Sequence, residues 1–191
     1  MKSLNRLGSR PVSLPLSADD VVEFHAARLL LLLNLCGTSG RIDGLTKLAK
    51  LDFFARYPEF FAAAKAATAN ETEKTQALKA ARAGDAVESA MVRHHYGPWD
   101  KRYYHVLAHL EAKQLIEVSK EGRAYRIILT NPGRERAKAL AERPSFQPLA
   151  TRMRELKKVF GARTGTSLKN LVYQLFDEEV GRRPLGQVIR R

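Results

Sequence analysis

Cysteine is almost absent from this chain, with Cys36 the only one among 191 residues. A single cysteine excludes an intrachain disulfide and a cysteine-rich zinc site, and it is typical of a reducing compartment such as the cytoplasm. Long apolar runs are missing as well. The longest, Ala26 to Leu33, contains Arg28 and falls well short of the roughly 20 residues that span a bilayer. No apolar segment precedes Pro15 to form a secretion signal. We therefore expect a soluble cytoplasmic protein that does not enter a membrane.

Acidic residues are scarce, above all in the second half of the chain. The sequence holds 33 Lys and Arg against 20 Asp and Glu, which gives a formal net charge of +13. From Gly122 to Arg191 the count is 16 Lys and Arg against 6 Asp and Glu. A one-sided positive excess favours a polyanionic partner, because each phosphate neutralised releases condensed counterions. The same charge also suits a protein that it keeps soluble, or a basic face that docks on an acidic protein.

The sequence lacks the local motifs of nucleophilic and nucleotide-dependent enzymes. It contains no GxSxG, no phosphate-binding loop and no GxGxxG. His105 and His109 have the spacing of two metal ligands on a helix, but no HExxH and no nearby cysteine completes a zinc site. Asp100, Glu111 and Lys113 imitate the acidic string of metal-dependent nucleases, yet the last two fall on a predicted helix rather than a strand. We expect no enzyme, no cofactor and no bound metal.

The most informative stretch runs from His95 to Thr130. After the Gly97-Pro98 turn, apolar residues recur at i, i+3, i+4 and i+7, which predicts a helix over 101–114 with Asp100 as its N-cap. Two β-branched runs follow, 115–118 and 125–129, joined by the polar turn 119–123. The stretch therefore predicts a helix followed directly by an antiparallel hairpin.

This order of helix, strand, basic turn and strand resembles the winged-helix superfamily and is similar to MarR-like and PadR-like bacterial regulators. Tyr96-Gly97-Pro98 before a helix also resembles, over three residues only, the SocA-like (Panacea) antitoxin domain. The winged-helix resemblance covers about a third of the chain. It implies duplex binding, with the helix in the major groove and the hairpin on the backbone or in the minor groove. The sequence departs from the pattern where residues 57–97 separate the second and third helices, which a short turn usually joins.

The predicted fold is mainly α: a winged-helix core with one small antiparallel β-hairpin and a C-terminal helical extension. We divide the chain into a flexible basic arm, a winged-helix domain and a basic helical extension, over residues 1–17, 18–142 and 143–191. Within the domain, residues 69–84 are expected to form a mobile insertion. Helices are expected over 19–36, 45–56, 59–68 and 85–95.

We expect double-stranded DNA to be contacted by three groups of basic side chains. The first group, on the helix face opposite the apolar stripe, is Lys101, Arg102, His105 and Lys113. The second group, on the hairpin, is Lys120, Arg123 and Arg126. The third group, on a later helix, is Arg152, Arg154, Lys157 and Lys158. Solvated charge is the plainer interpretation of each group. Trp99, beside Pro98, is expected to pack in the core rather than stack on bases.

An alternative function is an adaptor subunit that docks on a larger protein of a defence or toxin–antitoxin complex without reading DNA. It rests on the segment Val22–Leu33, which is apolar on nearly all sides, and on the long insertion. The same segment, with Leu168–Leu175, is the expected interface of a homodimer, since two-fold DNA-binding proteins double their contacts on repeated half-sites.

Overall fold

The computed structural model describes residues 21–68, 91–122, 124–182, 184–187 and 189. Its first part contains three helices and one short strand: α1 (Val22–Cys36), β1 (Arg41–Asp43), α2 (Leu45–Arg56) and α3 (Pro58–Thr68). A small ladder follows, β2 (Val92–His94) with β3 (Gly97–Trp99), and then α5 (Tyr103–Ala112), β4 (Ile116–Glu121) and β5 (Ala124–Leu129). The second half is helical: α6 (Asn131–Glu142), η2 (Pro144–Phe146), α7 (Gln147–Phe160), α8 (Gly165–Leu175) and η3 (Asp177–Gly181).

The prediction of a mainly helical fold with a small antiparallel hairpin is confirmed. The hairpin β4–β5 lies where the sequence predicts it, and β1 adds a third antiparallel strand to give the order β1-β5-β4. Ile127 occupies the middle of the sheet, opposite Ile42 on one side and Val118 on the other. Helix α5 begins and ends within two residues of the predicted range.

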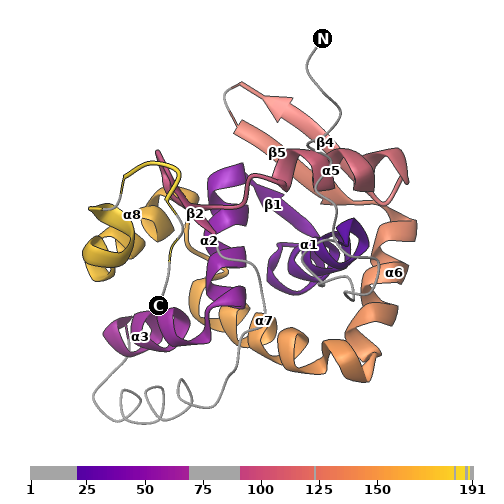
Figure 1. The fold of residues 1–191 in the computed structure, drawn as a ribbon. Helices are drawn as coiled ribbons and strands as arrows, with labels where there is room; N and C mark the ends of the chain where they lie inside the picture. Colours follow the sequence, from indigo (N-terminus) through magenta and orange to yellow (C-terminus); the bar gives the residue numbers. More distant parts are fainter. Residues whose placement is uncertain (1–20, 69–90, 123, 183, 188, 190–191) are drawn as a thin grey trace, which may run out of the picture.

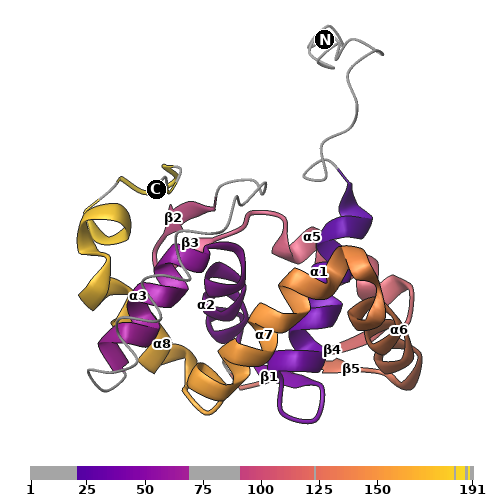
Figure 2. The same ribbon diagram turned by 90° about the horizontal axis from the view of Figure 1, so that it is seen from below.

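Helix α1 is the centre of the molecule. Leu31, Leu32 and Leu33 have no exposed surface, and helices α2, α5, α6 and α7 all pack against α1. Figures 1 and 2 show α7 on the side of α1 away from the hairpin, with α6 beside it. The apolar character of α1 on nearly all sides therefore reflects a helix enclosed by its own chain.

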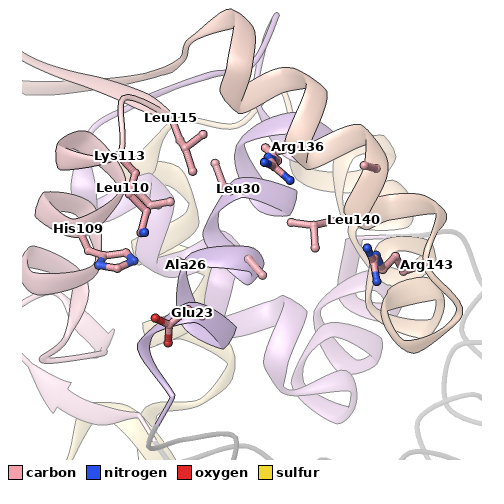
Figure 3. A pocket seen from close by; sticks show the side chains of 12 residues that line it. Glu23, Ala26, Leu30, His109, Leu110, Lys113, Leu115, Arg136, Leu140 and Arg143 are labelled. Atoms are coloured by element: carbon pink, nitrogen blue, oxygen red, sulfur yellow. The ribbon is translucent and has the colours of Figure 1, made fainter.

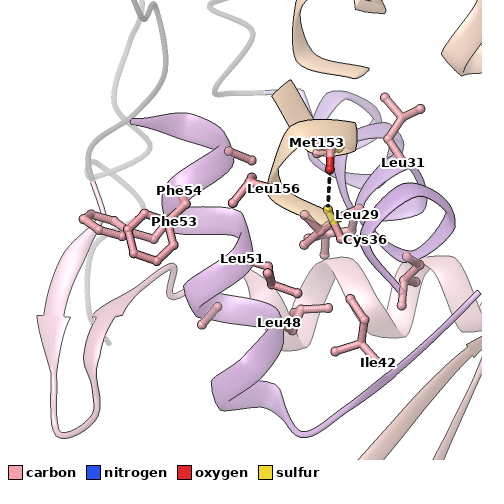
Figure 4. Packing of buried hydrophobic residues seen from close by; sticks show 14 of the residues in the cluster. Leu29, Leu31, Cys36, Ile42, Leu48, Leu51, Phe53, Phe54, Met153 and Leu156 are labelled. Atoms are coloured by element: carbon pink, nitrogen blue, oxygen red, sulfur yellow. Dashed lines mark hydrogen bonds between the residues drawn. The ribbon is translucent and has the colours of Figure 1, made fainter. Parts of the chain in front are cut away.

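The core is one continuous cluster that the C-terminal helices complete. Met153 and Leu156 of α7 pack with Leu29 of α1 and Leu51 of α2, as Figure 4 shows. The Cys36 thiol donates a hydrogen bond to the Met153 carbonyl at 3.2 Å. Leu168 and Val172 of α8 belong to the same cluster. The residues predicted as an extension are thus packed into the same core as the rest.

The predicted helix over residues 85–95 is wrong in the part that the structure describes. Residues 92–94 of the predicted helix 85–95 form strand β2, which pairs with β3 across the turn at His95 and Tyr96. The outer edge of β2 exchanges backbone hydrogen bonds with residues 186–187, because the Gly186 N–H donates to the Arg93 carbonyl and the Arg93 N–H donates to the Gln187 carbonyl. Residues 85–90, the predicted insertion 69–84 and the predicted arm 1–17 lie outside the described residues.

Because Leu171 of α8 is buried, a charge introduced at this part of the expected dimer interface should destabilise the fold. Leu171→Glu places a carboxylate in the core cluster, so we expect a loss of roughly 3 kcal/mol in the free energy of unfolding. Gln174→Glu, on the exposed side of the same helix, is the matched control and should change it by about 0.5 kcal/mol or less. Urea denaturation measures both. A folded, fully stable Leu171→Glu protein that has merely lost an oligomer would contradict this packing.

Candidate nucleic-acid interface

A buried carboxylate holds the N-terminus of α5. Asp100 is 6% exposed and accepts hydrogen bonds from Arg102 Nε at 2.9 Å and Arg102 Nη2 at 2.8 Å, and from Arg56 Nη1 at 2.9 Å. Its Oδ1 also accepts from the Arg102 backbone N–H at 3.0 Å. Burial opposes ionisation, but the hydrogen bonds from Arg102 and the charge of Arg56 outweigh it and hold the pKa of Asp100 well below its usual range.

A second buried carboxylate joins α1, α2 and α5. Asp52 accepts from Arg28 Nε at 2.8 Å and Nη2 at 3.3 Å, and from the Tyr103 hydroxyl at 2.8 Å. Arg28 and Tyr103 are each 1% exposed and Asp52 is fully buried. Burial, followed by the negative charge of Asp52, raises the pKa of Tyr103 well above its ordinary value, so the hydroxyl stays protonated and donates.

His25 links the two carboxylate sites. Its two ring nitrogens lie 2.9 Å from Arg28 Nη1 and 2.7 Å from Arg102 Nη1, and Arg28 Nη2 lies 3.7 Å from Asp100. We call this set of side chains the ionic network: His25, Arg28, Asp52, Arg56, Asp100, Arg102 and Tyr103. It fixes the start of α5 against α1 and α2 through directional hydrogen bonds rather than apolar packing alone.

The Gly97-Pro98 turn closes over a buried lysine. Lys50 Nζ donates to the Pro98 carbonyl at 2.9 Å and has no exposed surface. Gly97 has φ +92°, and a Cβ there would lie 3.3 Å from Lys50 Cε, so this position favours glycine for both conformation and space. Burial, followed by the nearby charge of Lys169, lowers the pKa of Lys50 to about 7.

The structure separates the predicted contacts on α5. Lys101, His105 and Lys113 are exposed, which leaves them available to a ligand. Arg102, predicted as a base reader, has its guanidinium engaged within the protein, where it bonds Asp100 and faces His25 in the ionic network. The sequence places Arg102 opposite the apolar stripe, but a buried carboxylate two residues earlier draws the side chain inward.

The predicted hairpin contacts differ in the same way. Lys120 is exposed on β4. Arg126 forms ion pairs with Glu121 across the hairpin and with Asp43 of β1, so its charge is balanced within the sheet. Arg123 lies outside the described residues.

The predicted contacts on α7 do not share a face with α5. Two of them cap other helices: Arg152 Nη1 donates to the Ala55 carbonyl at 2.7 Å, and Lys157 Nζ donates to the carbonyls of Cys36 at 3.2 Å and Gly37 at 2.8 Å. The last carbonyls of a helix lack intrahelical partners, which is why these cations turn inward. Arg154 and Lys158 are exposed on α7, and α7 lies on the side of α1 away from the hairpin (Figure 1). The three groups of predicted contacts therefore do not lie on one face of the protein.

Protein-family models, curated proteins and solved structures were compared with the chain. None of them matches it.

Neither a metal centre nor a reactive thiol is found in the part of the chain that the structure describes. No group of three or more His, Cys, Asp or Glu there could hold a metal ion. Burial raises the pKa of Cys36 to about 12, so its sulfur remains a protonated thiol. No helix among the described residues is long and apolar enough to cross a membrane.

The sequence patterns considered above did not predict the ionic network, although the sequence contains two signals for it. Arg28 interrupts a leucine run, and a charge within an enclosed helix requires a buried partner. Asp52 and Arg56 are four residues apart on an otherwise apolar α2, and Arg56 Nη1 lies 3.8 Å from Asp52 Oδ2. The pattern indicates buried charge, but it does not say that Asp100, 48 residues further along the chain from Asp52, completes the set.

Removing the Asp52 charge should destabilise the fold strongly. Asp52→Asn leaves Arg28 buried beside a neutral amide, so we expect a loss of about 3 to 5 kcal/mol in the free energy of unfolding. Asp43→Asn is the matched control, because Asp43 pairs with arginines but is 54% exposed, and a loss of at most about 1 kcal/mol is expected. Denaturant titration compares them. Equal effects of the two substitutions would argue against the network as the structural tie.

Lys50 should make stability depend on pH. Because the pKa of Lys50 falls from 10.5 to about 7 on folding, the unfolded chain binds a proton between these values that the folded chain does not. The contribution of Lys50 to the free energy of unfolding therefore rises with pH across that window, by about 1.4 kcal/mol per unit. Lys50→Met removes this rise, so the difference between wild type and variant should grow from pH 7 to 10. Lys158→Met, at an exposed position, is the control, and an equal trend in both variants would contradict the assignment.

Proposed function

We propose that this protein binds double-stranded DNA, with α5 in the major groove and the β4–β5 hairpin against the backbone. The observation that carries the proposal is topological. The order α1, β1, α2, α5, β4, β5, with the strands arranged β1-β5-β4, resembles that of a winged helix, although α3, β2 and β3 lie between α2 and α5. In this comparison α5 would be the recognition helix. A cytoplasmic location follows from the same proposal.

The shape of α5 suits this role. Tyr103, Val106 and Leu110 face the core, while the opposite side of the helix, including His105 and Ala108, is exposed. A helix of this kind fits the major groove, which is about 12 Å wide. The ionic network holds its N-terminal end rigidly, and recognition helices present that end to base edges.

The contact set differs from the one that the sequence suggests. Lys101, His105 and Lys113 remain at α5 and Lys120 remains on the hairpin, while Arg123, outside the described residues, stays a predicted contact. Arg102 positions α5 instead of touching DNA, and Arg126 is paired within the sheet. Most direct contacts would therefore be made to phosphates, which supports binding with modest sequence preference.

The excess of basic over acidic residues is larger on α6 and α7 than on α5 and the hairpin. Residues 131–163 hold 9 Lys and Arg against 3 Asp and Glu. In a chain of net charge +13, this surface attracts DNA over a distance and speeds the encounter between the two molecules. It does not contact the duplex in the proposed complex. The alternative adaptor function loses its main support, because the apolar segment of α1 is enclosed within the chain.

Charge reversal on two faces tests which surface meets the duplex. Lys101→Glu with Lys120→Glu should weaken binding at least tenfold and lower the salt slope by about 2, because two phosphate contacts are lost. Arg154→Glu with Lys158→Glu causes the same change in net charge on the α7 side and should weaken binding less than threefold. Electrophoretic shifts over a range of salt concentrations measure both. A larger effect of the α7 pair, or no shift by the wild-type protein at low salt, would overturn the proposal.

A further inference from the structure

A groove between α5 and α6 opens beside α1 and has an apolar floor. Its cavity is about 350 Å³, and the floor is formed by Ala26 and Leu30 of α1, Leu110 of α5, Leu115 and Leu140 (Figure 3). Ala26, Leu30 and Leu110 are buried members of the core, so the floor is a rigid part of the fold. The volume lies in the range of small-molecule sites, which are concave and mostly apolar with a few polar groups at defined places.

Basic side chains line both sides of this groove. His109 of α5 and Lys113 directly after α5 lie on one side, and Arg136 of α6 and Arg143 directly after α6 lie on the other, as Figure 3 shows. Glu23, at the α1 end, is the acidic residue of the lining. Among the residues that the structure describes, no carboxylate forms an ion pair with Lys113, Arg136 or Arg143. The groove therefore combines an apolar floor with an excess of positive charge at its rim.

We propose that this groove binds one small organic anion, a carboxylate on an apolar body. The apolar part would lie on the leucine and alanine floor, where burial stabilises it in proportion to the area removed from water. The carboxylate would lie between Lys113 and Arg136, and arginine can bind it through two parallel hydrogen bonds. This is a second function, and it can be measured in the absence of DNA, although Lys113 is also a predicted DNA contact.

The size of the groove favours a small molecule over a protein segment. A helix laid into a groove needs apolar anchors over several turns, whereas the floor here comes from two residues of α1 and single residues around them. Positive charge at both long sides also matches one compact anion held between them better than an extended neutral chain.

The test uses the full chain and octanoate, below the concentration at which it forms micelles, in isothermal titration calorimetry. We expect saturable binding of one octanoate per chain. Octylammonium has the same apolar body with the opposite charge, and should bind at least tenfold more weakly if the rim cations contribute.

Variants on α6 separate the groove from general charge. Arg136→Glu should weaken octanoate binding about tenfold, whereas Lys138→Glu, an exposed cation two residues away that does not line the groove, should change it less than twofold. Ala139→Trp, also exposed, fills the groove from its rim and should abolish binding while the melting temperature stays near that of wild type.

Four outcomes would overturn the proposal: no saturable binding of octanoate, equal binding of octanoate and octylammonium, equal effects of Arg136→Glu and Lys138→Glu, or unchanged binding by a folded Ala139→Trp variant. Each of these readouts is made without DNA, so failure here is distinct from failure of the proposed DNA binding.

Discussion

The ion pair between Arg28 and Asp52 is the constraint on which the arrangement of the helices depends. Both groups are removed from water, and that desolvation is recovered only where every charged atom finds a partner in good geometry. The partners come from three helices and the turn before α5, so the charges are satisfied only when α1, α2 and α5 meet in one relative position. Apolar side chains tolerate sliding and repacking, whereas a bidentate arginine and a tyrosine hydroxyl on one carboxylate do not. We infer that the network specifies the position of α5 more than it adds stability.

The same requirement for partners decides what the basic residues do. Lys157 and Arg152 donate hydrogen bonds to backbone carbonyls at the C-terminal ends of α1 and α2, respectively. Lys50 donates to the Pro98 carbonyl in the turn before α5, and Arg102 belongs to the ionic network. A count of positive charge in the sequence therefore overstates the number of cations that can meet a polyanion. The cations that remain exposed are divided between the α5 side and the α7 side of α1, and for that reason the proposed interface uses fewer residues than the charge excess suggests.

Local patterns predicted what is local. The stripe Tyr103, Val106, Leu107 and Leu110 and the two β-branched runs predicted α5 and the hairpin to within three residues at each end, because both signals are complete within a short window. Strand β1 could not be found this way, since its three residues become a strand only by pairing with β5, more than 80 residues later. The surroundings of the basic residues on α7 could not be predicted for a related reason. A lysine opposite an apolar stripe has the same sequence pattern whether it meets solvent or the end of a neighbouring helix, and only the packing of α7 on α1 distinguishes them.

Helix α5 connects the two proposed sites, because each of its ends belongs to a different one. Its first turn is fixed by the ionic network beside the proposed DNA face, and its last turn contributes His109, Leu110 and Lys113 to the α5–α6 groove. Lys113 is also one of the predicted DNA contacts. An anion that holds Lys113 beside Arg136 would therefore compete with a DNA phosphate for the same side chain. By thermodynamic linkage, the factor by which the anion changes DNA affinity must equal the factor by which DNA changes anion affinity.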